Sequence, residues 1–123
     1  GGIVGDAIGA QTVISLCSNT GTITSTNMMV GGIAARLGDN NAVCTIYNCF
    51  NTGALSGKGT VGGLVAMLQS PTAGSARSLI ANSYNTGVIT SAANAAGGIV
   101  AMINAYSEVK NCINSATVTT AVK

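Results

Sequence analysis

Short apolar runs alternate with polar, glycine-rich segments along the whole chain. The runs at 43–49, 64–68 and 88–90, for example, are rich in aliphatic and β-branched residues, and Gly, Asn and Ser separate them. Short runs bounded by turn-forming residues predict β-strands, and no segment combines the 3.6-residue apolar period with the capping residues of a helix. The sequence therefore predicts an all-β fold.

Two signatures recur four times in the same order. A Gly-Gly pair followed by aliphatic residues begins at residues 1, 31, 62 and 97. An Ile-x-x-Cys-x-Asn-Thr-Gly segment, or a variant of it, occupies 14–21, 46–53, 80–87 and 109–116. Because recurrence at a fixed period indicates a repeat architecture, we divide the chain, as a single domain, into the repeats 1–30, 31–61, 62–96 and 97–123.

Each repeat holds three apolar runs: one after the Gly pair, one in the second signature and one after Thr-Gly. Three short strands in every repeat of about 30 residues predict a parallel β-solenoid of four coils, one coil per repeat. Parallel crossovers favour a right-handed coil. Four coils at about 4.8 Å each give a body only about 19 Å tall.

In-register stacking places equivalent residues in ladders along the solenoid axis. We expect three apolar ladders inside: Ile14, Ile46, Ile80 and Val109; Ile23, Leu55, Ile89 and Val118; Ile3, Ile33, Leu64 and Ile99. A side-chain amide ladder is expected at a corner, formed by Asn19, Asn51, Asn85 and Asn114. Gly21, Gly53 and Gly87 are expected to supply a turn conformation closed to residues with a Cβ, and Ala116 predicts a different fourth corner.

The composition excludes several classes of function. The chain has no His, which rules out His-based catalysis, His zinc ligands and His pH switches. Five Lys and Arg against three Asp and Glu make no basic patch, so nucleic acid is not an expected partner. No apolar stretch reaches the length of about 18 residues that membrane insertion needs. A surface solubilised by Ser, Thr, Asn and Gly is typical of secreted and cell-surface proteins.

Residues 48–53, Asn-Cys-Phe-Asn-Thr-Gly, and 62–65, Gly-Gly-Leu-Val, resemble the GLUG repeat. That repeat occurs in large bacterial surface and secreted proteins, among them immunoglobulin-A-cleaving metallopeptidases and adhesin-like proteins. The resemblance covers essentially the whole chain as four copies, and it implies an extracellular or cell-surface bacterial scaffold. The metallopeptidase chemistry does not follow, because the chain has neither His nor a cluster of metal ligands.

The cysteines invite a redox or metal interpretation. Cys17, Cys49 and Cys112 share one repeat position with Ser83, which predicts a structural column of small buried residues; a Cys17–Cys49 cross-link between adjacent coils is the alternative. Cys44 lies an odd number of residues before Cys49, so we expect it to point to the other face. No paired cysteine spacing fits zinc, and we expect neither a metal nor a cofactor.

The remaining polar and aromatic residues do not suggest an enzyme. Asp6, Asp39 and Glu108 occupy different repeat positions, so no pair of carboxylates is expected to meet across a cleft. Asp6 shares its position with Arg36, which predicts a surface ion pair. Phe50 and Tyr84 are also equivalent. They predict a short aromatic stripe, for which corner packing is favoured over sugar binding.

Two features favour assembly. Strict alternation after the Gly pairs predicts a second apolar face, a lateral interface formed by Val4, Val65, Met67, Val100 and Met102. The chain also opens on the first residues of a repeat and ends where another Gly pair would follow, with no capping pattern. Open solenoid ends invite pairing. We therefore expect polymerisation through the residues at the two ends, namely Gly1, Gly2, Ile3, Val118, Val122 and Lys123.

These patterns lead to a structural hypothesis and a binding hypothesis. The first is a non-enzymatic subunit of an extracellular filament, a homopolymer stacked head to tail. In this filament Cys112 of one subunit approaches Cys17 of the next. The alternative is a stalk or a glycan- or host-binding module of a large bacterial surface adhesin.

Overall fold

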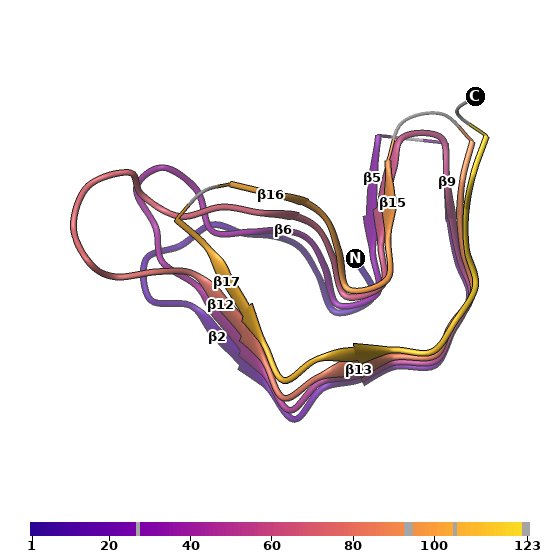
Figure 1. Cartoon of the computed structure of the whole chain (residues 1–123), viewed down its shortest axis with the longest axis horizontal. Helices are drawn as coiled ribbons and strands as arrows, with labels where there is room; N and C mark the ends of the chain where they lie inside the picture. The colour runs from indigo at the N-terminus through magenta and orange to yellow at the C-terminus, as the bar shows by residue number, and fades with distance from the viewer. Residues whose placement is uncertain (27, 93–94, 105, 122–123) are drawn as a thin grey trace.

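The chain forms a parallel β-solenoid of about four coils (Figure 1). The computed structural model describes residues 1–26, 28–92, 95–104 and 106–121, and no helix occurs in that part of the chain. Every strand pairs in parallel with its equivalents in the neighbouring coils. The predicted fold class is therefore confirmed.

The strands stack into five sheets. The first sheet contains β1 (Val4–Ala7), β6 (Ala34–Leu37), β11 (Val65–Leu68) and β16 (Val100–Ile103). The second contains β2 (Val13–Ser15), β7 (Thr45–Tyr47), β12 (Leu79–Ala81) and β17 (Glu108–Lys110). The third contains β3 (Ser18–Asn19), β8 (Phe50–Asn51), β13 (Tyr84–Asn85) and β18 (Ile113–Asn114). The fourth contains β4 (Ile23–Ser25), β9 (Leu55–Gly57), β14 (Ile89–Ser91) and β19 (Val118–Thr120). The fifth contains β5 (Met29–Gly31), β10 (Thr60–Gly62) and β15 (Ala96–Gly97).

The middle coils have five strands each, where the sequence predicts three. One extra strand, represented by β5, β10 and β15, ends on the first Gly of the Gly pair. The other arises because a turn divides the second signature into two strands. At this turn Asn48, Asn82 and Asn111 adopt the left-handed backbone conformation, with φ between 49° and 53°. Asn tolerates that conformation better than most residues do.

The predicted apolar ladders are present in register. Ile46 pairs with both Ile14 and Ile80, and the other two columns extend through the coils in the same way. In coils two and three the inward side chains are fully buried: Ile33, Ile46, Leu55, Leu64, Ile80 and Ile89 are at most 1% exposed. Stacking of repeats thus builds a continuous core from a chain that has few aromatic residues.

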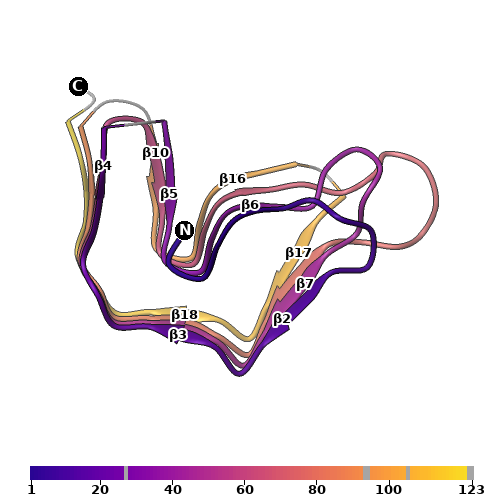
Figure 2. The same cartoon turned by 180° about the vertical axis from the view of Figure 1, so that it is seen from behind.

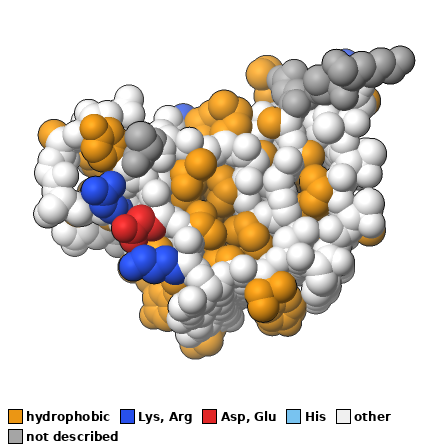
Figure 3. Space-filling model, viewed as in Figure 1, with side chains coloured by type: hydrophobic (Ala, Val, Ile, Leu, Met, Phe, Trp, Pro, Cys, Tyr) orange, Lys and Arg blue, Asp and Glu red, His pale blue; other side chains and the backbone are white. Residues whose placement is uncertain are grey.

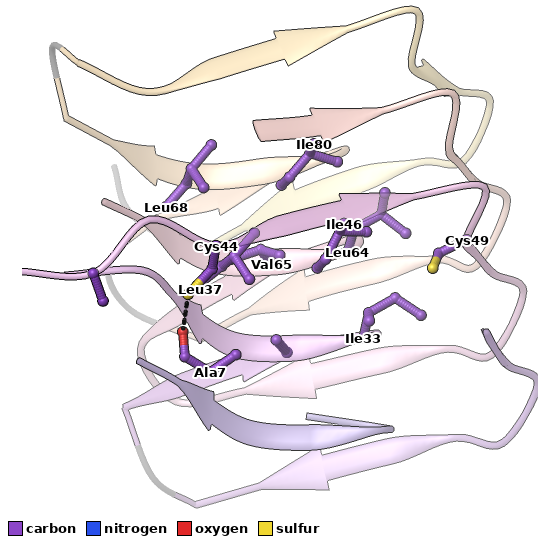
Figure 4. Packing of buried hydrophobic residues seen from close by; sticks show 12 residues of the cluster. Ala7, Ile33, Leu37, Cys44, Ile46, Cys49, Leu64, Val65, Leu68 and Ile80 are labelled. Atoms are coloured by element: carbon purple, nitrogen blue, oxygen red, sulfur yellow. Dashed lines mark hydrogen bonds between the residues drawn. The ribbon is translucent and has the colours of Figure 1, made fainter. Parts of the chain in front are cut away.

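The interior is divided into two lobes (Figure 1). The larger core fills the space between the β1 and β2 sheets, and Figure 4 shows its packing. The smaller core, formed by Val30, Leu55, Val61 and Ile89, lies between the β4 and β5 sheets. At the waist between the lobes, the second Gly of each pair lies against the ladder Asn of the same coil: a Cβ on Gly32 would sit 2.6 Å from Cγ of Asn51.

Two predictions about the corner that follows the ladder Asn are wrong: the turn conformation of its glycines and the different corner at Ala116. Gly21, Gly53 and Gly87 do not have positive φ, so a left-handed turn is not their role. Gly53 and Gly87 instead allow a close approach, since a Cβ on either would lie 2.0 Å from a carbonyl oxygen of the preceding coil. Ala116 keeps the same corner hydrogen bond, because its carbonyl accepts Nδ2 of Asn114 at 3.0 Å.

Candidate functional site

The ion pairs of the described residues lie on the surface. Arg36 and Asp6 form the predicted surface ion pair at 2.8 Å, and Glu108 lies 3.4 Å from Lys110. Within the described ranges no three His, Cys, Asp or Glu side chains gather in a metal-binding group. Nor does that part of the chain contain a helix long and apolar enough to cross a membrane.

The cysteine column is built from free thiols that bond to backbone. Cys17, Cys49 and Cys112 each donate to the carbonyl two residues earlier, at 3.2 to 3.3 Å, and Ser83 does the same at 2.7 Å. Serine and cysteine are thus interchangeable in this geometry. The column therefore matches the structural interpretation favoured from the sequence.

Cys44 does not point away from Cys49 as predicted. Both side chains are buried in the larger core, and Cys44 Sγ donates to the Ala7 carbonyl at 3.2 Å (Figure 4). The reason is the turn at Asn48, which separates the two cysteines and resets the alternation of side chains.

Thiol accessibility predicts the order of alkylation. Burial raises the pKa of the Cys49 and Cys112 thiols above the ordinary value. With iodoacetamide at pH 8 on the unassembled subunit, we expect Cys17 to react first, Cys112 more slowly, and the buried Cys44 and Cys49 only after unfolding. The raised pKa also means that the folded state keeps these thiol protons at pH values where the unfolded chain loses them. The free energy of unfolding should therefore fall as the pH rises above about 9. Peptide mass mapping of a labelling time course measures the order, and early labelling of Cys49 would contradict this burial.

The aromatic stripe is present as one stacked pair. The rings of Phe50 and Tyr84 lie 5.0 Å apart between centroids and are parallel to within 2°. One face of each ring is consequently covered by the other ring. This geometry fits packing along the axis and leaves no open two-ring platform for a sugar.

The predicted lateral interface is only partly on the surface. Val65 is fully buried and belongs to the larger core, against which Val4 and Val100 are packed. The bend at the Gly pair places Leu64 and Val65 both inside, so strict alternation does not hold there. Met67 and Met102 remain accessible and line a shallow hollow with Leu68 and Ile103.

The two ends of the solenoid expose what the middle coils bury. In coil four, Ile103 is 52% and Val109 39% exposed, whereas Leu68 and Ile80, their partners in coil three, are fully buried. Ile3 and Val118, both predicted at the ends, are likewise exposed. Figure 3 looks onto the coil-four end and shows apolar side chains gathered across its middle, and Figure 2 shows the opposite end.

The backbone at the first end is paired with coil two. Gly2 and Ile3 donate to the carbonyls of Gly31 and Ile33, and Gly1 is exposed. Val122 and Lys123, predicted at the other end, lie outside the described residues.

Leu16, Ile103 and Ile113 are exposed apolar residues of the first and last coils that the sequence reasoning missed. Leu16 is 81% exposed and adopts φ 54°, in the column where the other three coils have Asn. This replacement of Asn by Leu was the available signal, since it puts an apolar side chain at a strained surface position. All three residues lie in coils one and four.

A scan against protein-family models finds no matching family, and searches among curated proteins and solved structures find no match either.

Proposed function

We propose that this protein is the structural subunit of an extracellular filament, in which copies stack head to tail and continue the solenoid. One observation carries the proposal. The side chains of the inward apolar columns are buried in coils two and three, whereas several of them are exposed in coils one and four. A second copy placed on either end would cover these side chains and extend the main-chain ladders.

The apolar surface at the ends favours burial. Covering a side chain such as Ile103 or Val109 contributes about 25 cal/mol for each Å² of apolar surface removed from water. The unpaired strand edges of the end coils add main-chain hydrogen bonds. A partner that supplies equivalent strands in the same register satisfies both, and another copy of this chain is such a partner.

The surface chemistry supports a structural role outside the cell. Only 7% of the residues are charged, and none of the described side chains forms a metal-ligating group. The resemblance to repeats of bacterial surface proteins favours an extracellular or cell-surface location. We do not propose an enzymatic activity, a cofactor, a nucleic-acid partner or membrane insertion.

The alternative is a stalk or a glycan- or host-binding module of a large surface adhesin. The exposed ends support it as well, because further coils of the same polypeptide would cover them equally. The covered ring faces of Phe50 and Tyr84 favour the stalk over the glycan-binding module.

Negative-stain electron microscopy of the native protein, with intact mass from the same sample, tests the proposal. We expect long uniform fibres built of a chain of about 12.0 kDa. Monodisperse particles would overturn the filament proposal. A covalent mass many times larger would instead support the adhesin stalk.

A charge at the coil-four end should block assembly. In Val109→Lys the long side chain reaches water in the free subunit, but stacking would bury its ammonium group against the next copy. We expect no fibres by electron microscopy and only small species by sedimentation, with an unchanged far-UV circular dichroism spectrum.

Val88→Lys is the matched control for this variant. Val88 is half exposed in coil three, on the side of the solenoid, so the same charge there should leave fibres intact. Fibres of Val109→Lys as abundant as those of Val88→Lys would rule out stacking through the apolar columns.

A further inference from the structure

The amide ladder at the waist has a direction. Nδ2 of Asn19 donates to Oδ1 of Asn51 at 2.7 Å, and Asn51 donates to Asn85 in the same way. Nδ2 of Asn85 then donates to Oδ1 of Asn114 at 2.8 Å. All three bonds run from the lower to the higher coil, and the second N–H of each Asn is used by a carbonyl of its own corner.

The two ends of this ladder are complementary. At coil four, Asn114 donates one N–H to the Ala116 carbonyl, and its other N–H has no acceptor among the described residues. At coil one, Oδ1 of Asn19 receives no hydrogen bond from any described residue. One end thus offers an amide donor and the other an amide acceptor, on the same axial column.

We propose that the partner of each end is a second copy of this chain in one polarity and one register, set by a hydrogen bond from Nδ2 of Asn114 to Oδ1 of Asn19 in the next copy. This inference rests on the proposed filament and deepens it. The bond continues the ladder across the junction with the donor–acceptor order found inside the subunit. The same register continues the apolar columns across the junction and places Ile14 of the next copy beside Val109.

Other arrangements leave the waist unsatisfied. Joining two coil-four ends brings two amide donors together, and joining two coil-one ends brings two acceptors together. A slip along the strand removes the amide partner and breaks the apolar columns. Each buried polar group left without a partner costs about 1–3 kcal/mol, so the ladder selects against these arrangements.

The charges agree with this register. Continuing the second sheet places Glu108 beside Val13 and Lys110 beside Ser15 of the next copy. Continuing the first sheet places Met102 beside Asp6. None of these neighbours is a pair of like charges.

Asn114→Asp tests the junction bond. The carboxylate still accepts the hydrogen bond from Asn85, but it has no proton to donate either to the Ala116 carbonyl of its own corner or to Asn19 of the next copy. At pH 7 we expect the concentration needed for fibres to rise about tenfold or more, since two acceptors would face each other in the junction. Below pH 4 the protonated carboxyl carries one O–H, which replaces one of the two N–H donors of Asn114 and removes the charge, so the concentration needed for fibres should fall part of the way back toward the wild-type value.

Asn111→Asp is the matched control, because it adds the same charge to the same coil at an exposed corner. Sedimentation and electron microscopy of the wild type and both variants, at pH 7 and at pH 3, give the readout. We expect the wild type and Asn111→Asp to form fibres at both pH values. Equal assembly of Asn114→Asp and Asn111→Asp at pH 7 would overturn the junction bond, and so would a defect of Asn114→Asp that is as large at pH 3 as at pH 7 while the control assembles. Absence of wild-type fibres would overturn the filament proposal itself.

Discussion

Gly63→Ala is expected to unfold the solenoid under conditions in which the wild type is stable. A Cβ on Gly63 would lie 1.9 Å from the carbonyl oxygen of Gly98 and 2.8 Å from Cγ of Asn85. Neither neighbour is free to move away, because one is the backbone of the next coil and the other is a fully buried ladder residue. Relief would require adjacent coils to separate at the waist.

The expected loss is more than about 4 kcal/mol, a large part of the 5–15 kcal/mol that stabilises an ordinary domain. Urea denaturation followed by circular dichroism measures the free energy of unfolding. Gly5→Ala is the matched control, since nothing lies within 4 Å of a Cβ at that position. We expect the control to be neutral or stabilised by up to about 1 kcal/mol, because alanine restricts the unfolded chain. Similar stability of the two variants would show that the waist does not require glycine.

The sequence predicts the coils and their register well because the period itself encodes them. Equivalent residues such as Ile46 and Ile80 had to meet once the repeats were aligned, and the parallel pairing follows from that alignment. The same reasoning predicts the Asn ladder, since a polar side chain that recurs at one repeat position has its own copies as partners. These predictions require only the alignment of the repeats, and they do not depend on the shape of the solenoid cross-section.

The shape of the cross-section was not predictable from alternation alone. Val65 and Cys44 were both assigned to the wrong face, because a bend lies between each of them and its reference residue. At the Gly pair the bend is concave and brings two successive residues inside. At Asn48 the left-handed residue resets the alternation. The period of two holds only within a strand, and these strands have two to four residues.

The roles of the glycines were missed for a related reason. The sequence shows Gly63 and Asn85 at fixed repeat positions but not that they touch, because that contact joins the two sides of the waist. Local turn chemistry suggested positive φ, whereas the structure requires close approach. Ile103 was likewise overlooked, because its column is buried in the preceding coil and its exposure comes from the absence of a fifth described coil rather than from its own pattern.

Asn85→Leu is expected to cost about 3–5 kcal/mol of folding stability despite the similar size of the two side chains. Asn85 is fully buried and donates to the Gly87 carbonyl at 2.9 Å and to Asn114 Oδ1 at 2.8 Å. Its own Oδ1 accepts from Nδ2 of Asn51 at 2.7 Å. Leucine leaves all of these partners without a bond, and Asn51 and the Gly87 carbonyl lie in a space closed to water, so their desolvation penalties add.

The matched control for Asn85→Leu is Asn111→Leu, which makes the same replacement at the exposed outer corner. Leu16 already occupies that column at φ 54°, so the turn accepts leucine, and the expected cost is about 1 kcal/mol from backbone strain. Chemical denaturation of both variants gives the difference directly. A loss at position 85 no larger than that at 111 would mean that the ladder contributes little to folding. The large difference expected here would show that the amides stabilise each coil on the next, which is the property that a junction between subunits built on the same ladder requires.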